Sequence, residues 1–273
     1  MFFDHFPDKG LIGAHRGARS IAPENTLLSM TKAKGCGAHF WETDIRLSKD
    51  GELIVFHDNT LERTTNIATH AAYQDRTDWH VDQYTLRELR QLDAGSWFLI
   101  DDPFGTVASG EVGGWESTAI QEQKIPLLLE ILNFTKTHSF PVNLEIKDLK
   151  TPLEDVFIVD MIVDMLHETD TMDLVLLSSF VPEYLHRARS LNKNISTAFI
   201  AGEQHPPNLI HYLKSISALA YHPNVAICDD ALINELQKAG FCVSSWTAND
   251  MERAQEMLHL GAGVITDWPQ RLT

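Results

Sequence analysis

The sequence predicts an α/β protein folded as a single TIM-type (β/α)8 barrel over residues 1–273. Short apolar runs alternate with helical patterns along the whole chain. The apolar runs are continuous, which is typical of parallel strands covered on both faces. No linker rich in Pro, Gly or Ser divides the 273 residues, and one α/β barrel commonly fills roughly 200–250 residues. Repeated alternation of strand and helix patterns over this length favours a closed barrel over a doubly wound sheet.

Nine segments have strand character, which is one more than the barrel needs. Only a turn around residues 49–51 separates the second from the third, so we expect one barrel connection too short to hold a helix. The nine candidates are Leu11–Ala14, Phe40–Ile45, Leu53–Phe56, Val142–Ile146, Leu174–Ser178, Thr197–Ala201, Ala218–Tyr221, Cys242–Trp246 and Val264–Thr266.

Helical patterns fill most of the gaps between these strands. Asn249-Asp250 is a typical helix start, and Gly240 and Gly261 are typical of helix ends. In Pro23-Glu24-Asn25-Thr26 we expect Glu24 or Asn25 to begin a helix, as a structural rather than a catalytic feature. The expected helices are Asn25–Lys34, Leu127–Thr137, Leu153–His167, Pro182–Leu191, Ala231–Ala239 and Asp250–Leu260.

A long segment from Gly95 to Lys124 has no clear period and contains four further glycines, at positions 105, 110, 113 and 114. Segments of this length inside a compact domain are usually functional loops or lids. We therefore expect a long loop insertion around residues 95–124.

The formal net charge of −16 argues against binding to nucleic acid or to anionic membranes, which require clustered Lys and Arg. An anionic substrate would need a local positive centre, for which a divalent cation is the simplest candidate. The three cysteines, Cys36, Cys228 and Cys242, form no CxxC pair, so we expect reduced thiols in the core. Residues 1–10 contain no apolar run long enough for a signal peptide or membrane span, which predicts a cytoplasmic location.

Carboxylates lie two residues apart near the ends of two predicted strands. Glu42 and Asp44 share one face of their strand, as do Glu145 and Lys147. Three converging carboxylates would form an oxygen site suited to Mg²⁺, Ca²⁺ or Mn²⁺. The alternative is that they only form ion pairs with Arg16, Arg46 or Lys147, and the residues alone leave both interpretations open.

Two histidines follow predicted strands, His15 after the first and His57 after the third. At strand ends they could act as an acid and base pair. Arg16 and Lys147 could bind phosphate or neutralise carboxylates. Trp246 could form an apolar wall beside the metal or belong to the core. The residues after His57, namely Asp58, Arg63, Thr64 and Thr65, look like a hydrogen-bonded loop that fixes its ring.

Several motifs recur together in a fixed order from Gly13 to Pro269, namely Ala14-His15-Arg16-Gly17, Pro23-Glu24-Asn25-Thr26, Glu42-x-Asp44, His57-Asp58, Asn143-Leu144-Glu145-Ile146-Lys147, Trp246-Thr247-x-Asn249 and Ile265-Thr266-Asp267. Taken together, they resemble the glycerophosphodiester phosphodiesterase family, which is related in fold to phosphatidylinositol-specific phospholipase C. The segment Gly105–Lys124 is longer than the family's usual connection, which puts the choice of substrate in doubt.

The resemblance implies a phosphoric diester hydrolase that releases glycerol 3-phosphate from glycerophosphocholine, glycerophosphoethanolamine or similar small molecules. It implies one divalent cation held by Glu42, Asp44 and Glu145, catalysis by His15 and His57, and substrate contacts from Arg16 and Lys147. Trp246 is expected to line the substrate site. Two alternatives remain: a lysophospholipase D or phospholipase C-like enzyme whose apolar lid includes Val107, Val112 and Trp115, and a non-catalytic phosphodiester-binding module.

Overall fold

Eight parallel strands close into a barrel in the computed structural model, which describes residues 1–6, 10–114, 116–149 and 154–273. The last strand pairs with the first, and the first pairs with the second, so the sheet has no open edge. The predicted barrel is confirmed. Its strands are β1 (Ile12–Ala14), β2 (Phe40–Leu47), β4 (Val142–Ile146), β5 (Val175–Ser179), β6 (Ser196–Ala201), β7 (Ala220–Pro223), β8 (Cys242–Ser245) and β9 (Gly263–Thr266).

The ninth strand, β3 (Leu53–Val55), lies outside the barrel and pairs antiparallel with β2, with Val55 opposite Ile45. The expectation of a shortened barrel connection is therefore wrong. A turn of a few residues can join antiparallel strands, whereas a parallel pair needs a crossover of a dozen or more. Because β2 continues past the residues that pair with β4, β3 can fold back along its extension.

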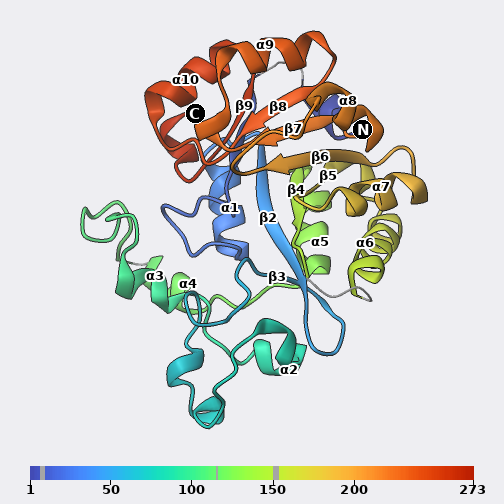
Figure 1. Cartoon of the computed structure of the whole chain (residues 1–273). Coiled ribbons are helices and arrows are strands. Elements are labelled where there is room, and N and C mark those ends of the chain that lie inside the picture. The colour runs from blue at the N-terminus through green and yellow to red at the C-terminus, as the bar shows by residue number, and fades with distance from the viewer. Residues whose placement is uncertain (7–9, 115, 150–153) are drawn as a thin grey trace.

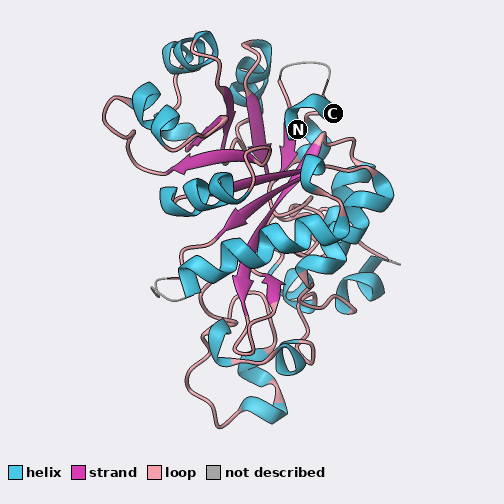
Figure 2. Ribbon diagram, turned by 90° about the vertical axis from the view of Figure 1, so that its right-hand side faces the viewer, coloured by secondary structure: helices cyan, strands magenta, loops and turns pink. Residues whose placement is uncertain are grey.

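Helices flank the strands on the outside of the barrel (Figure 2). Five of them were predicted to within about three residues, and Leu153, the predicted start of the sixth, lies outside the described residues. The short helix α8 was not predicted. These helices are α1 (Leu27–Gly35), α5 (Leu128–His138), α6 (Glu154–Thr169), α7 (Pro182–Leu191), α8 (Leu209–Ser215), α9 (Asp230–Lys238) and α10 (Met251–His259).

The residues between β3 and α5 form a separate lobe, seen in Figure 1 with α2, α3 and α4 gathered at one end of the molecule. These helices span Leu86–Leu89, Ser96–Asp101 and Glu116–Gln121. The expected long loop thus contains two short helices that bury Phe98, Val112 and Ile120 together. Gly95 is required there, since a Cβ would lie 1.7 Å from the Ile120 carbonyl oxygen.

The interior of the barrel is apolar at the amino-terminal ends of the strands and polar at the carboxyl ends. Phe40, Leu176, Ala198, Ala220 and Ile265 form the apolar layer. Since side chains two residues apart share a face, the next inward positions are Glu42, Ser178, Ile200, His222 and Asp267. Gly13 leaves room for Phe40, whose ring carbon would lie 2.4 Å from a Cβ, and His15 follows it on the same face. The barrel therefore gathers polar groups at its carboxyl end.

None of the helices within the described ranges is long and apolar enough to cross a membrane. Of the three cysteines, Cys228 is buried, Cys36 is partly buried and Cys242 is exposed, so the expectation of core thiols is wrong for Cys242.

Candidate active site

Three carboxylates converge at the carboxyl end of the barrel. Glu42 and Asp44 come from β2 and Glu145 from β4, where Asp44 lies directly opposite Glu145. One oxygen of each lies within 4.8 Å of the others, and all three groups are buried. The predicted convergence is thus present, on adjacent strands.

The charges in this cluster fit a cation. Burial and the neighbouring Asp44 and Glu145 raise the pKa of Glu42 well above its usual value. Burial would also raise the pKa of Asp44, but the charges of His57, Lys147 and Arg16 and a hydrogen bond from Asn25 hold it below its usual range. Asp44 Oδ1 has no hydrogen-bond partner among the described residues. A divalent cation would relieve the repulsion among the three carboxylates, and Asp44 Oδ1 could coordinate it.

Lys147 and Arg16 lie beside the carboxylates. Lys147 Nζ donates to Glu145 Oε1 at 2.6 Å and lies 3.4 Å from Asp44 Oδ1. Arg16 Nε lies 3.5 Å from Asp44 Oδ2, and the Arg16 backbone N–H donates to Glu42 Oε2 at 3.0 Å. Of the ion pairs in the alternative interpretation, those of Arg16 and Lys147 are therefore present around the cluster that could hold a cation, whereas Arg46 Nε donates to the His57 carbonyl at 2.9 Å.

His15 is held by an acidic residue at the end of the last strand. Its Nδ1 lies 2.6 Å from Asp267 Oδ1, and Asn249 Nδ2 donates to the other oxygen of Asp267 at 2.7 Å. His15 Nε2 lies 4.0 Å from Glu42 Oε2, so this edge of the ring faces the carboxylates. Burial, with the charge of Arg16, lowers the pKa of His15 to about 4.

His57 reaches the site by a different route from the one expected. It follows the antiparallel strand β3, which lies outside the barrel. The prediction that both histidines follow barrel strands is therefore wrong for His57. Phe56 N donates to Asp44 O, which places His57 beside the end of the barrel. Its Nδ1 lies 2.6 Å from Asp58 Oδ1, and Arg63 Nε donates to Asp58 Oδ2 at 2.6 Å. The expectation that Asp58 and Arg63 fix the ring is met.

Glu24 joins three arginines beneath the site. Its carboxylate accepts from Arg16 Nη1 at 2.8 Å and Arg63 Nη2 at 2.7 Å, and lies 2.7 Å from Arg19 Nη2. Burial would raise the pKa of Glu24, but these positive charges hold it below its usual range. Of these arginines, Arg16 lies beside the carboxylates, and Glu24 thereby fixes its guanidinium there.

The interpretation of Glu24 or Asn25 as a helix cap was wrong. Thr26 begins α1 instead, and its side chain accepts a hydrogen bond from Ser29 N. Asn25 donates to Asp44 Oδ2 at 2.8 Å and accepts from Thr43 Oγ1 at 2.7 Å. Asn25 and Arg16 both adopt left-handed backbone conformations, with φ of 56° and 52°, which is a strain that commonly accompanies functional sites.

A cavity of about 150 Å³ lies among these groups. Trp246 lines it as predicted, with its ring edge-to-face against Phe180 at 5.7 Å between centroids. The residues lining the cavity are His15, Arg16, Glu42, His57, Asn143, Glu145, Lys147, Phe180, Ile200, His222, Trp246 and Ile265. Seven of the eight residues predicted for the site thus line one cavity, and the eighth, Asp44, lies directly beside it.

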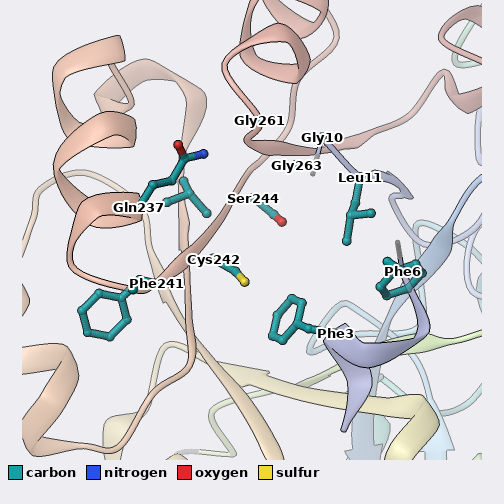
Figure 3. A pocket seen from close by; sticks show the side chains of 12 residues that line it. Phe3, Phe6, Gly10, Leu11, Gln237, Phe241, Cys242, Ser244, Gly261 and Gly263 are labelled. Atoms are coloured by element: carbon teal, nitrogen blue, oxygen red, sulfur yellow. The ribbon is translucent and has the colours of Figure 1, made fainter. Parts of the chain in front are cut away.

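A larger hollow of about 370 Å³ lies at the amino-terminal ends of β8 and β9. Figure 3 shows the side chains of Phe3, Leu11 and Cys242 around it. Among the described residues that line it there is no carboxylate, histidine, lysine or arginine. The charged groups thus favour the smaller cavity at the opposite end as the active site.

Several residues of the site were not predicted. Asp267 belongs to a motif that had been noted without a role, and its position directly after the last strand is the signal that could have identified it. Asn249 had been assigned to a helix start, which Asp250 provides instead. Arg19 and His222 stand in no motif of the sequence, so only the closed barrel brings Arg19 close to Asp267 and His222 into the cavity.

Comparison with known proteins identifies relatives along most of the chain. A model of the glycerophosphoryl diester phosphodiesterase family matches residues 15–271. A glycerophosphodiester phosphodiesterase of Bacillus altitudinis is 32% identical over 265 residues, which is 95% of each chain. Glycerophosphoinositol inositolphosphodiesterase of Mus musculus is 40% identical over 147 residues, but the chain covers only 26% of that protein's length.

Solved structures agree with these relatives. An Oleispira antarctica phosphodiesterase, in complex with the product sn-glycerol-3-phosphate, matches with a TM-score of 0.80 and 28% identity, covering 97% of this chain and 95% of the other. A structure from Silicibacter pomeroyi matches with a TM-score of 0.83 at 20% identity, covering 99% of this chain and 95% of the other, and supports the fold alone.

Proposed function

The chain belongs to the glycerophosphoryl diester phosphodiesterase family, and we propose that it hydrolyses glycerophosphodiesters to glycerol 3-phosphate and an alcohol with the help of one divalent cation. The observation that carries the proposal is the buried cluster of Glu42, Asp44 and Glu145, which shares one cavity mouth with two carboxylate-held histidines. A relative of the same fold binds sn-glycerol 3-phosphate as its product.

The cation would be held by Glu42, Asp44 and Glu145, since their oxygens are mutually close and Asp44 Oδ1 accepts no hydrogen bond from the described residues. When bound, such an ion polarises a phosphoryl oxygen and offsets the negative charge of the diester. Mg²⁺, Ca²⁺ and Mn²⁺ all suit a site of oxygen ligands.

Arg16 and Lys147 would bind the phosphate oxygens. Arg16 keeps its Nε without a hydrogen-bond acceptor in the described part of the chain, while Glu24 fixes its Nη1. Burial would lower the pKa of Lys147, but Asp44 and Glu145 raise it above its usual value, so its ammonium stays charged. A fixed guanidinium and a charged ammonium are suited to a phosphodiester.

The two histidines would move the protons. In each ring Nδ1 is bound to a carboxylate, Asp267 for His15 and Asp58 for His57, which leaves Nε2 to exchange protons with the substrate. One histidine would take a proton from the attacking hydroxyl, and the other would give one to the departing alcohol. The attacking group is water or the glycerol 2-hydroxyl.

The lipid-cleaving alternative loses support from the insertion. Val112 is buried against Phe98 and Ile120, so it is not available to contact an acyl chain, and Trp115 lies outside the described residues. The binding-module alternative is disfavoured because each proposed catalytic and metal-binding residue is present at the cavity.

The test is release of glycerol 3-phosphate from a panel of glycerophosphodiesters and lysophospholipids. We expect release from glycerophosphocholine, glycerophosphoethanolamine or a related diester. Preferential cleavage of lysophospholipids would favour the lipid enzyme. No release from any of them by folded protein supplied with Mg²⁺, Ca²⁺ or Mn²⁺ would refute the proposal.

A further inference from the structure

His222 is a third histidine in the active-site cavity, and none of the catalytic roles proposed above uses it. It lies on β7, two residues after Ala220 on the inward face, and opposite Ile200 of β6. Its side chain is 1% exposed and lines the same cavity as His15 and His57. It therefore lies deep in the pocket. Its strand, β7, is not one of the two strands, β2 and β4, that carry the carboxylates.

The His222 ring has no hydrogen-bond partner among the described residues, at either Nδ1 or Nε2. Its backbone carbonyl, in contrast, accepts from Trp246 Nε1 at 2.9 Å. Burial of a polar group without a partner is costly, and such groups usually serve a function or bind a ligand. The free ring nitrogens are thus available to a molecule in the cavity.

The chemistry of the ring indicates a hydroxyl as that ligand. Burial lowers the pKa of His222 to about 3, so the ring is neutral near pH 7. A neutral imidazole offers one donor and one acceptor, which match the acceptor and donor of an alcohol. Within the described ranges no carboxylate holds the ring, unlike the rings of His15 and His57, so a proton-transfer role is not supported. Ile200, Trp246 and Ile265 supply apolar surface beside it for carbon atoms.

The enclosed position of His222 indicates which half of the diester, glycerol or the departing alcohol, it would contact. Phe180, on the same cavity, is 42% exposed and marks the side open to solvent, where an alcohol of variable size can extend. His222 is enclosed, and suits the part common to all these substrates. We propose that His222 binds a hydroxyl group of the glycerol half of the substrate and thereby selects glycerophosphodiesters over phosphodiesters that lack hydroxyls. This inference rests on the proposed function.

The experiment compares binding of glycerol 3-phosphate and n-propyl phosphate, which differ only in the two hydroxyls, by calorimetry in the presence of Mg²⁺. The unmodified protein should prefer glycerol 3-phosphate by roughly 10-fold or more, the effect of leaving a buried polar group unpaired. His222→Leu should abolish the preference and leave the affinity for n-propyl phosphate within about threefold. His222→Gln, which retains a donor and an acceptor, should keep part of the preference.

His186→Leu provides the matched control, because it makes the same substitution at an exposed position on the outer helix α7. It should leave the ratio of the two affinities unchanged. The Tm of His222→Leu should not fall, since leucine replaces a ring with no partner. If this variant does not fold, the ring ¹⁵N resonances of His222 in the unmodified protein give the answer, and should shift with glycerol 3-phosphate but not with n-propyl phosphate.

Equal affinities for the two ligands in the unmodified protein, or an unchanged preference in His222→Leu, would overturn the assignment. Either result could occur in an enzyme that still releases glycerol 3-phosphate, and would leave the proposed function in place. Failure of the proposed function is recognised separately, by the absence of turnover in the unmodified protein.

Discussion

Replacement of Asp267 by asparagine tests whether His15 acts through Nε2. Asp267 Oδ1 lies 2.6 Å from His15 Nδ1 and favours the tautomer with a proton on Nδ1. An asparagine of the same shape can place its amide donor there, which moves the proton to Nε2 and removes the free lone pair that faces Glu42. The fold should change little, because Asn249 Nδ2 can still donate to the remaining side-chain oxygen.

The loss should approach the full contribution of one acid–base group, roughly 10²- to 10⁴-fold in kcat. This corresponds to about 3 to 5 kcal/mol of activation free energy, at 1.36 kcal/mol for each factor of ten. KM should change much less, since the proposed phosphate contacts come from Arg16 and Lys147. Steady-state release of glycerol 3-phosphate at saturating metal measures both constants.

Asp160→Asn is the matched control, because it makes the same substitution in an ion pair with Arg187 on the outer helices, with N–O distances of 2.8 Å. Its kcat should equal that of the unmodified protein. The double variant of His15→Ala with Asp267→Asn should have the same kcat as His15→Ala alone, since His15 and Asp267 act as one catalytic pair and either substitution removes it. A kcat for Asp267→Asn within threefold of the unmodified protein would refute the reasoning.

Three further predictions concern the catalytic role of His57, the ion-pair network around Glu24 and the packing of the barrel interior. His57→Ala should lower kcat by roughly 10²- to 10⁴-fold with little change in Tm, and full activity would exclude His57 from catalysis. Glu24→Gln should lower the free energy of unfolding by about 3 to 5 kcal/mol in urea titrations, since it leaves the largely buried Arg16 and Arg19, and the more exposed Arg63, without their shared carboxylate. Glu111→Gln, at an exposed pair with Arg271, should cost less than about 0.5 kcal/mol; equal effects would contradict the role of Glu24. Leu176→Ala in the barrel interior should cost about 2 to 5 kcal/mol, and a loss below 1 kcal/mol would show that this layer is not tightly packed.

The positions of the barrel strands were predictable because each is a continuous apolar run followed by a turn or helix signal. The carboxylates could be identified from the same pattern, since Glu42, Asp44 and Glu145 interrupt apolar strands at positions that face inward. A charge at such a position needs a partner or a metal, so local sequence alone indicates a site there.

Pairing direction and contacts distant in sequence were not predictable in the same way. Leu53–Val55 has the same composition as a barrel strand, and its antiparallel pairing follows from the short turn before it, a constraint that had been noted but not applied. Asp267 lies 252 positions from His15, and Glu24 lies 39 positions from Arg63. The His222 ring has no hydrogen-bond partner among the described residues, so only the closed barrel identifies it.

The most direct test of the central claim is a single titration of the metal-free protein with Mg²⁺, Ca²⁺ or Mn²⁺, in which the bound cation and the rate of glycerol 3-phosphate release are measured together. We predict that activity rises in step with occupancy, reaches its maximum at one cation per chain, and is lost when a chelator is added. In Glu145→Gln both affinity and activity should fall. Full activity in chelator, or cation binding that Glu145→Gln leaves unchanged, would contradict the assignment of a catalytic cation to Glu42, Asp44 and Glu145.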